Sequence, residues 1–301
     1  GAEAPLTAAI NNLAAVEYQL GNIPAGMTHW EEALRRQQLA GDTLQQARTH
    51  NNIGMALRAQ GELDQAAIHF DKALLLRQRA HDTVGGMITQ ANIAGVRYEQ
   101  GDFVAAERIY QQLLKQHEAM GDRAGQALSL NDLAAIDEQL GRLNEERQRL
   151  LEAELIQDEI QDATNLVTTL NNLALVELSA GNSRRAAVYA DRAMSLAEST
   201  GNLAASVYSI TYKAAAKVLA NEPDAATDLL ERAMALAADL NLQSARLYPL
   251  LWAARAQAGG ASLDLAEGYA REAVTLANER GHKPMERQAG KELAQICERR
   301  E

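Results

Sequence analysis

Asparagine recurs at one position along the chain, at intervals of forty residues, and its side chain has the chemistry to bind a peptide backbone. This asparagine column is formed by Asn12, Asn52, Asn92 and Asn172, and Asp132 stands in its fourth place. A carboxamide both donates and accepts hydrogen bonds, as the backbone of an extended peptide does. Asparagine is also a mediocre helix former, so its repetition inside a helical pattern needs a reason.

The sequence carries no recognisable signature of catalysis. The motifs GxxxxGK[ST], GxSxG and HExxH do not occur, because His117-Glu118 lacks the second histidine of the last motif. We expect Cys297, the single cysteine, to be a buried residue near the end of the chain rather than a nucleophile. We also expect no pair of histidines with the spacing of metal ligands, since all six lie in different segments: His29, His50, His69, His81, His117 and His282. The chain is therefore predicted to be no enzyme and to hold no metal or cofactor.

Composition and charge exclude several further classes. The chain has 301 residues, of which 47% are hydrophobic, enough to bury a continuous core. A net charge of −11 disfavours direct binding to nucleic acid or to an anionic membrane surface. One cysteine excludes an intramolecular disulfide and any multi-cysteine zinc site. No apolar run reaches about twenty residues, and the stretch from Gly1 to Pro5 is too short and polar for a signal peptide. These features predict a cytoplasmic protein.

The asparagine column belongs to an internal repeat of forty residues. The stretch NNLAAVEYQLG, which begins at Asn11, recurs from Asn51, Ala91, Asn131 and Asn171. Glycine is the last residue of each copy, and a second set of glycines falls midway between them: Gly21, Gly61, Gly101, Gly141 and Gly181, then Gly41, Gly121, Gly201 and Gly281. A fixed period of this length is the signature of a repeat architecture.

Each repeat is predicted to form two helices of about 16 residues. Apolar and small residues fill columns at helical spacing, among them the Leu column and the Val column that follows it three residues later. These two columns, which we expect in the core, contain Leu13, Ile53, Ile93, Leu133, Leu173 and Leu293, and Val16, Val96, Ile136 and Val176. The glycines would end helices, and the Asp, Asn or Glu after them would cap the next ones, as at Asn22, Asp42, Glu62, Asp102, Asp122 and Asn202.

Several columns together resemble the tetratricopeptide repeat family. They are the Leu-Ala pair, the glycine eight residues after the Leu, the alanine five residues beyond that glycine, the aromatic residue four later, and Ala-Leu pairs such as Ala73-Leu74. The forty-residue length is similar to the longer class found in kinesin light chains, cortical-polarity adaptors and the sensor arrays of bacterial regulators. The resemblance implies an all-α, right-handed solenoid of about seven helix-turn-helix repeats, with first helices lining a concave groove.

The resemblance also sets the expected boundaries. A single solenoid would occupy residues 1–301, and Asn221-Glu222-Pro223 and Gly259-Gly260 mark weaker repeats near its end. A charged last helix with Leu293 and Ile296 in register would cap the array. The expected repeats span 3–41, 42–81, 82–121, 122–161, 162–201, 202–241 and 242–281, and the capping helix spans 283–301.

In the resemblance, the asparagine column faces the groove, where it would contact a ligand. The alternative is that these residues, with Asn11, Asn51, Asn131 and Asn171, tie adjacent repeats together. Further contacts are expected one and two turns along the same face, at Arg48, Met55, Arg58, Ile88, Tyr98, Glu138, Thr168 and Leu175. In the sixth and seventh repeats four aromatic residues share this face, either as an anchor pocket or as core between repeats: Tyr208, Tyr212, Tyr248 and Trp252.

The sequence thus predicts a non-catalytic interaction module that binds an extended peptide or a partner protein. The alternative is a sensor domain of a multidomain bacterial-type signalling ATPase or transcription regulator, which would bind a small inducer or a signalling peptide. The chain begins almost directly in a first helix, which suggests an excised fragment. A first repeat without a polar cap would also permit self-association.

Overall fold

In the computed structural model, which describes residues 3–259, 262–279 and 283–300, every regular element is helical. The first seven helices are α1 (Glu3–Gln19), α2 (Ile23–Ala40), α3 (Thr43–Ala59), α4 (Leu63–Arg79), α5 (Thr83–Glu99), α6 (Phe103–Met120) and α7 (Arg123–Leu140). They are followed by α8 (Leu143–Glu159), α9 (Ala163–Ser179), α10 (Ser183–Thr200), α11 (Leu203–Leu219) and α12 (Pro223–Asp239). A 3₁₀ turn, η1 (Gln243–Arg246), precedes α13 (Leu247–Gly259), α14 (Leu263–Glu279) and α15 (Lys283–Arg300). No helix in these ranges is both long and apolar enough to cross a membrane.

The turns between helices recur every twenty residues with the same backbone conformation. Each of the eight glycines at positions 21, 41, 61, 101, 121, 141, 181 and 201 has a φ between 68° and 82°. His81, Gln161, Asn221 and Asn241 occupy the places where this series lacks a glycine, and they also have positive φ. The left-handed conformation costs a residue with a side chain roughly 1–2 kcal/mol. Packing of the flanking helices therefore imposes the turn even where the sequence signal is missing. Gly260 and Gly281 lie outside the described residues.

The expected helix caps form at most of the predicted positions. The side chains of Asp42, Asp102, Asp122 and Asn202 accept a hydrogen bond from the backbone N–H three residues later, at 3.0–3.1 Å. The prediction is wrong at Asn22 and Glu62, whose side chains make no capping bond. Asn22 instead donates to the carboxylate of Glu17, 2.8 Å away, so its side chain points back toward the preceding helix.

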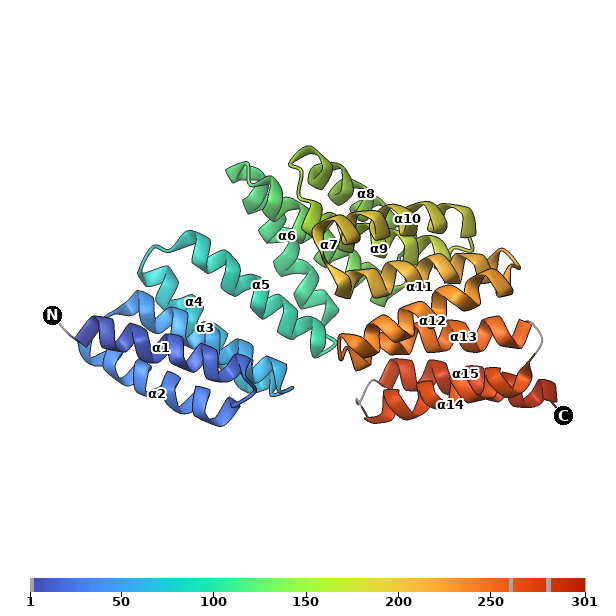
Figure 1. The fold of residues 1–301 in the computed structure, drawn as a ribbon. Coiled ribbons are helices and arrows are strands. Elements are labelled where there is room, and N and C mark those ends of the chain that lie inside the picture. Colours follow the sequence, from blue (N-terminus) through green and yellow to red (C-terminus); the bar gives the residue numbers. More distant parts are fainter. Residues whose placement is uncertain (1–2, 260–261, 280–282, 301) are drawn as a thin grey trace. The chain divides into compact units, whose positions relative to one another are not determined.

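Within each of two compact units, successive helices pack against one another as in a helical repeat solenoid, which confirms the predicted all-α class. The chain forms two compact units, residues 1–140 and 141–301, here called the N-terminal and C-terminal units. In the N-terminal unit each of the helices α1 to α6 contacts the next one, and the first helices α1, α3 and α5 also contact each other in order. In the C-terminal unit the same pattern links α9, α11, α13 and α15 (Figure 1). The first helices thus form one layer within each unit.

Small residues in fixed columns let the helices of a repeat approach closely. The alanines of the second helices, such as Ala66 and Ala73, are fully buried. Gly54 in α3 faces the buried ring of Phe70 in α4, and a Cβ atom at Gly54 would lie only 2.8 Å from the ring. The Leu column is buried at Ile53, Ile93, Leu133 and Leu173. The absence of a side chain at Gly54 therefore leaves the space that the Phe70 ring occupies in the core.

The first repeat departs from the predicted core. Leu13 and Val16 are 44% and 48% exposed, although their counterparts in later repeats are buried. A second helix of the preceding repeat covers these columns elsewhere, as Trp30 and Leu34 of α2 cover Ile53, and no described element does so for α1. The expectation that both residues lie in the core is wrong for this reason. Self-association through this apolar surface stays a prediction.

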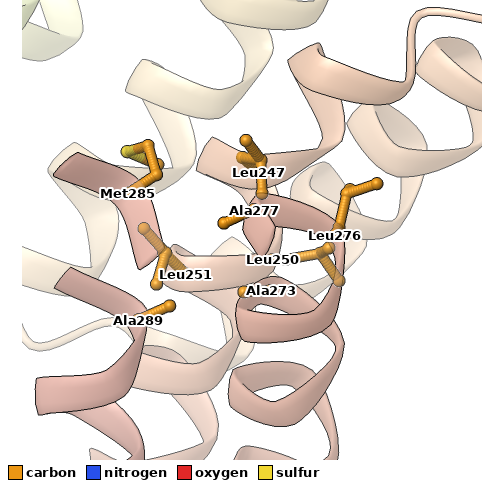
Figure 2. Close-up of a cluster of buried hydrophobic side chains, with 8 residues drawn as sticks. All are labelled: Leu247, Leu250, Leu251, Ala273, Leu276, Ala277, Met285 and Ala289. Carbon is orange, nitrogen blue, oxygen red and sulfur yellow. The ribbon is translucent and has the colours of Figure 1, made fainter. Parts of the chain in front are cut away.

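The last helix closes the C-terminal unit. Met285 and Ala289 of α15 pack against Leu247 and Leu251 of α13 and against Ala277 of α14 (Figure 2). Further along α15, Ile296 is buried, whereas the side chains after it are exposed apart from the half-buried Cys297. The helix has one apolar and one polar face, as expected of a cap on a repeat array. Cys297 was expected to be buried and is instead half-buried, because it lies beside the buried stripe rather than on it.

Candidate functional site

Two neighbouring asparagine columns on the first helices have different surroundings. Asn11, Asn51 and Asn171 lie one residue before the asparagine column and bind the next repeat. The side-chain oxygen of Asn11 accepts a hydrogen bond from the hydroxyl of Thr49 at 3.1 Å, and that of Asn171 accepts one from Ser209 at 2.8 Å. Both donors lie 38 residues downstream of their acceptor. This column provides the tethering between repeats that was one of the two readings of the sequence.

The asparagine column itself is turned further toward solvent. Asn12 is exposed, and Asn52, Asn92 and Asn172 are half-buried. Asn92 donates to the side-chain oxygen of Asn51 at 3.0 Å. In the described part of the chain, the amides of Asn12, Asn52 and Asn172 have no hydrogen-bond partner. Adjacent positions on the helix therefore differ: the amides of Asn11, Asn51 and Asn171 bond to the next repeat, whereas those of Asn12, Asn52 and Asn172 do not.

Three predicted residues line a single cavity in the N-terminal unit. Asn12, Arg48 and Asn52 border a hollow of about 370 Å³ over α1, α3 and α4. The remaining lining residues are Ala8, Asn11, Gln45 and Arg77. The lining thus contains two guanidinium groups and several amides but no carboxylate, and it suits a ligand group that accepts hydrogen bonds.

The predicted residues further along this face are engaged to different degrees. The Arg58 guanidinium donates to the Glu99 carboxylate at 2.9 Å and lies against the backbone of Gly95, where a side chain would collide with it. The Glu99 hydrogen bond raises the pKa of Arg58. Tyr98 packs against the ring of Phe103 and belongs to the edge of the core. The Met55 side chain is 51% exposed and leaves an apolar surface beside the amides.

Asp132 replaces asparagine in the fourth place of the column, and its carboxyl group has an unusual environment. Burial raises the pKa of Asp132 to about 6, although the positive charge of Arg58 acts in the opposite direction. Burial likewise raises the pKa of Glu138 on the same helix. The folded chain therefore binds a proton at Asp132 more tightly than the unfolded chain, in which an aspartate has a pKa of about 4.

We predict that Asp132→Asn stabilises the chain at pH 7.5. Because the folded-state pKa is raised, folding favours the protonated acid, and stability falls as the pH rises from about 4 through 6. A shift of about two pKa units corresponds to at most about 3 kcal/mol, and solvent access to the carboxyl group reduces this to roughly 1–2 kcal/mol. Urea unfolding of the wild-type chain and of Asp132→Asn at pH 7.5 and pH 4 measures this difference in stability. An equal difference at the two pH values would contradict the raised pKa of Asp132.

In the C-terminal unit the predicted aromatic residues gather, but not all on an open surface. The rings of Tyr208, Tyr212 and Tyr248 lie with their centres 6.3–6.4 Å apart. Tyr212 is only 5% exposed and packs in a core cluster with Ala186. Tyr208 is half-buried and borders a cavity of about 320 Å³ next to η1. The sequence left two interpretations open. Tyr212 lies in the core between repeats, whereas Tyr208 lines an accessible pocket.

Trp252 is also half-buried, and it packs with Arg255 one turn along α13. The Arg255 guanidinium lies 4.7 Å from the centre of the Trp252 ring, a cation–π geometry. This arrangement fixes the indole in place on the edge of the aromatic group. Trp252 therefore combines a packing role with an exposed edge.

The histidines include one close pair that the sequence analysis did not expect. His50 and His69 approach with their Nδ1 atoms 3.2 Å apart, whereas no pair of histidines with the spacing of metal ligands was expected from the sequence. The antiparallel packing of α3 on α4 brings them together across 19 residues of sequence. Burial lowers the pKa of His50 to about 4, so the pair is neutral near pH 7. In the described ranges no three residues of types His, Cys, Asp or Glu form a metal-binding group.

Comparison with known proteins identifies the repeats. The sequence model of the tetratricopeptide repeat matches residues 6–79, which span the first two of the observed helix pairs. The helix pairs within this segment are tetratricopeptide repeats. The forty-residue period carries the tetratricopeptide columns beyond the matched segment, and the predicted recognition is confirmed. No curated protein matches the chain in sequence.

Solved structures with the same fold extend over nearly the whole chain. The apo form of RapI is 14% identical, with a TM-score of 0.70 over 97% of both chains. The Rap conjugation gene regulator of the plasmid pLS20, in complex with the Phr* peptide, is 15% identical, with a TM-score of 0.64 over 88% of this chain and 72% of that chain. A signal transduction ATPase with numerous domains and a tetratricopeptide repeat sensor, from Pyrococcus horikoshii, is 16% identical, with a TM-score of 0.65 over 96% of this chain and 44% of that chain. At these identities the likeness concerns the fold.

Three polar residues that complete the cavity beside Asn12 and Asn52 were not predicted from the sequence. Asn11 was assigned to the structural column only, yet it also borders the hollow. Gln45 lies three residues before Arg48, on the same face of α3, and this spacing could have indicated it. Arg77 sits at the end of α4, where a charged residue is typically solvated, and no sequence signal distinguishes it.

Proposed function

We propose that this tetratricopeptide array binds an extended peptide, or an extended segment of a partner protein, along the first helices of its N-terminal unit. The free amides of Asn12 and Asn52, at the rim of the hollow that also holds Arg48, are the observation that carries the proposal. Side-chain amides at regular spacing on successive helices match the alternating N–H and C=O groups of an extended backbone. The role is binding and not catalysis.

The amides alone do not supply a useful affinity. Two carboxamides that each make two hydrogen bonds contribute about 4 kcal/mol at roughly 1 kcal/mol per bond, which corresponds to about millimolar affinity. Exposed apolar side chains along the same helices supply the remainder. Met55, Ile88 and Leu128 are 51%, 53% and 48% exposed, and they would receive apolar side chains of the ligand. Direct nucleic-acid binding is not part of the proposal, since the net charge is −11.

Two fold neighbours support this choice of ligand. The Rap regulator of the plasmid pLS20 was solved in complex with the Phr* peptide, which supports a peptide as the ligand. The Pyrococcus protein uses its tetratricopeptide repeats as a sensor, by its own description. Asn172 in the C-terminal unit presents the same free amide and is a proposed additional contact.

A matched pair of variants tests the proposal. Peptides selected from a random twelve-residue library on the intact chain are expected to bind Asn52→Ala five- to tenfold more weakly in fluorescence polarisation, with unchanged stability. The neighbouring change, Asn51→Ala, removes the acceptor for Asn92 and Thr89 and is expected to lower the free energy of unfolding by about 1–2 kcal/mol while peptide affinity is kept. Failure to select any peptide, or unchanged affinity in Asn52→Ala, would contradict the proposal.

A second candidate function is supported by the cavity beside η1. Its lining includes Tyr208 together with Leu242 and Ser244, a mixture of aromatic, apolar and polar groups that suits a small ligand. In this case the chain would act as the sensor part of a larger regulator, as the Pyrococcus neighbour does. Peptide affinity that depends on Tyr208 but not on Asn52 would favour the sensor reading.

A further inference from the structure

One junction between repeats differs from its neighbours by a missing side chain. At the start of α3 and α7, Gln46 and Gln126 fill the space beside the end of the preceding helix. Their amides donate to the carbonyl oxygens of Gln37 and His117, at 3.2 and 3.4 Å. The equivalent position at the start of α5 is Gly86. A Cβ atom there would have its nearest neighbour, Leu74, at an ordinary contact distance of 3.9 Å, so the backbone leaves room for a side chain.

A pocket occupies the space that a glutamine fills in the other two junctions. It has a volume of about 280 Å³ and lies between α4, α5 and the end of α6. Gly86 and Met87 form part of its lining from α5, Leu74 and Arg77 contribute from α4, and Gln116 contributes from α6. These residues are distinct from the asparagine column, and Arg77 alone is shared with the hollow beside Asn52.

Two buried polar atoms in this lining lack partners within the described chain. Arg77 is 6% exposed, and its Nε donor has no hydrogen-bond acceptor, because the Asp82 carboxylate lies 4.0 Å away. The side-chain oxygen of Gln116 is buried and has no donor. Buried polar groups are nearly always hydrogen-bonded, so an orphan donor and an orphan acceptor in one pocket indicate that a polar molecule completes them.

The chemistry of the lining defines the ligand. An acceptor is needed beside Arg77 and a donor beside Gln116, and Leu74 and Met87 offer apolar surface in the same pocket. The charged lining residues include the cation Arg77 and the anion Asp82, so a ligand with both charges suits the pocket better than a simple anion. A carboxylate, an ammonium group and a short apolar side chain occur together in aliphatic α-amino acids.

We propose that the pocket formed around Gly86 binds a small aliphatic α-amino acid, with its carboxylate at Arg77 and its ammonium group at Gln116. The site shares only Arg77 with the hollow proposed for peptide binding, and the proposal does not rest on peptide binding. Because the pocket lies where two repeats meet, a bound molecule would join α5 to the end of α4, as the glutamine joins the equivalent helices in the neighbouring junctions, and would also contact α6.

Calorimetric titration of the intact chain with L-leucine, L-valine and L-methionine tests the proposal. Saturable binding of at least one of them is expected. For the amino acid that binds, the analogues that lack the ammonium group or the carboxylate, such as 4-methylpentanoate and isoamylamine for L-leucine, are expected to bind at least tenfold more weakly. No saturable binding of any of the three would overturn the proposal, and equal binding of the analogues would overturn the assigned ligand class.

Two variants locate the site. Gly86→Gln restores the residue of the neighbouring junctions, so it is expected to fill the pocket and weaken binding at least tenfold without lowering the melting temperature. Gly268→Gln is the matched control, because this exposed glycine lies in open space on α14. Gln116→Leu keeps the volume of the lining but removes the acceptor, and the same loss is expected. Unchanged binding in folded Gly86→Gln or Gln116→Leu would overturn the location.

Discussion

Phe70→Ala is expected to lower the stability of the N-terminal unit by about 3–5 kcal/mol, the range observed when a large buried aromatic side chain is removed. The Phe70 ring is fully buried and packs with Ala66, Ile93 and Val96 across α4 and α5. The ring also packs directly on the backbone of α3 at Gly54, a position that has no side chain to fill the space if the ring is removed. Hydrogen–deuterium exchange followed by mass spectrometry should show faster exchange in α3, α4 and α5.

Ile68→Ala provides the control for this loss. Ile68 lies two residues away on the same helix and is 51% exposed, so its truncation is expected to cost less than about 0.5 kcal/mol. Similar exchange rates in the Phe70 and Ile68 variants would show that the ring does not hold the three helices together. Faster exchange confined to the turn at Gly61 would contradict the packing described here.

Glu177→Ala is expected to destabilise the C-terminal unit by about 2–4 kcal/mol. The Glu177 carboxylate is 1% exposed and accepts hydrogen bonds from Arg147 at 2.8 Å and from Asn182 at 2.7 Å. Its removal leaves the Nε–H of Arg147, a side chain only 20% exposed, without its carboxylate acceptor, and the long 3.5 Å bond from Arg147 to Asn144 remains. Breaking a buried pair from one side typically costs about 3–5 kcal/mol, and the partial exposure of Arg147 places the expected value at the lower end.

An exposed ion pair provides the comparison. Glu198 and Arg232 approach to 3.3 Å with both side chains more than half exposed, so Glu198→Ala is expected to cost less than about 1 kcal/mol. Urea unfolding in low salt and in 1 M NaCl separates the two cases, because solvent ions screen the exposed pair and not the buried one. A loss in Glu177→Ala that disappears in 1 M NaCl would contradict the buried network.

The helical architecture follows from the sequence because each turn is specified locally. A residue that ends a helix in the left-handed conformation is usually glycine, and forty-residue spacing of glycine was enough to place the helices. His81 and Asn221 take the same conformation without being glycine, since the helices on either side already fix the path of the chain. Leu13 was misassigned because a column of apolar residues does not reveal whether a covering helix exists.

The candidate site was predictable in kind but not in detail. The sequence indicated amides on the first helices, but neighbouring residues differ by about 100° around a helix, so it could not decide which of Asn51 and Asn52 faces the next repeat. Packing decides it, because Thr89 of the following repeat lies within reach of Asn51. The burial of Arg77 was equally hidden, since it depends on Gly85 in the next helix, where a Cβ atom would lie 2.3 Å from the guanidinium group.

The central claim is that the Asn52 amide pairs with the backbone of a bound peptide, and a double-mutant cycle tests it most directly. A selected peptide and the same peptide N-methylated at single backbone positions are titrated against the wild-type chain and Asn52→Ala. If the amide contacts the backbone, methylation at one position weakens wild-type binding about fivefold or more and has little further effect in Asn52→Ala. If methylation at every position weakens binding by the same factor in the wild-type chain and in Asn52→Ala, the claim is contradicted.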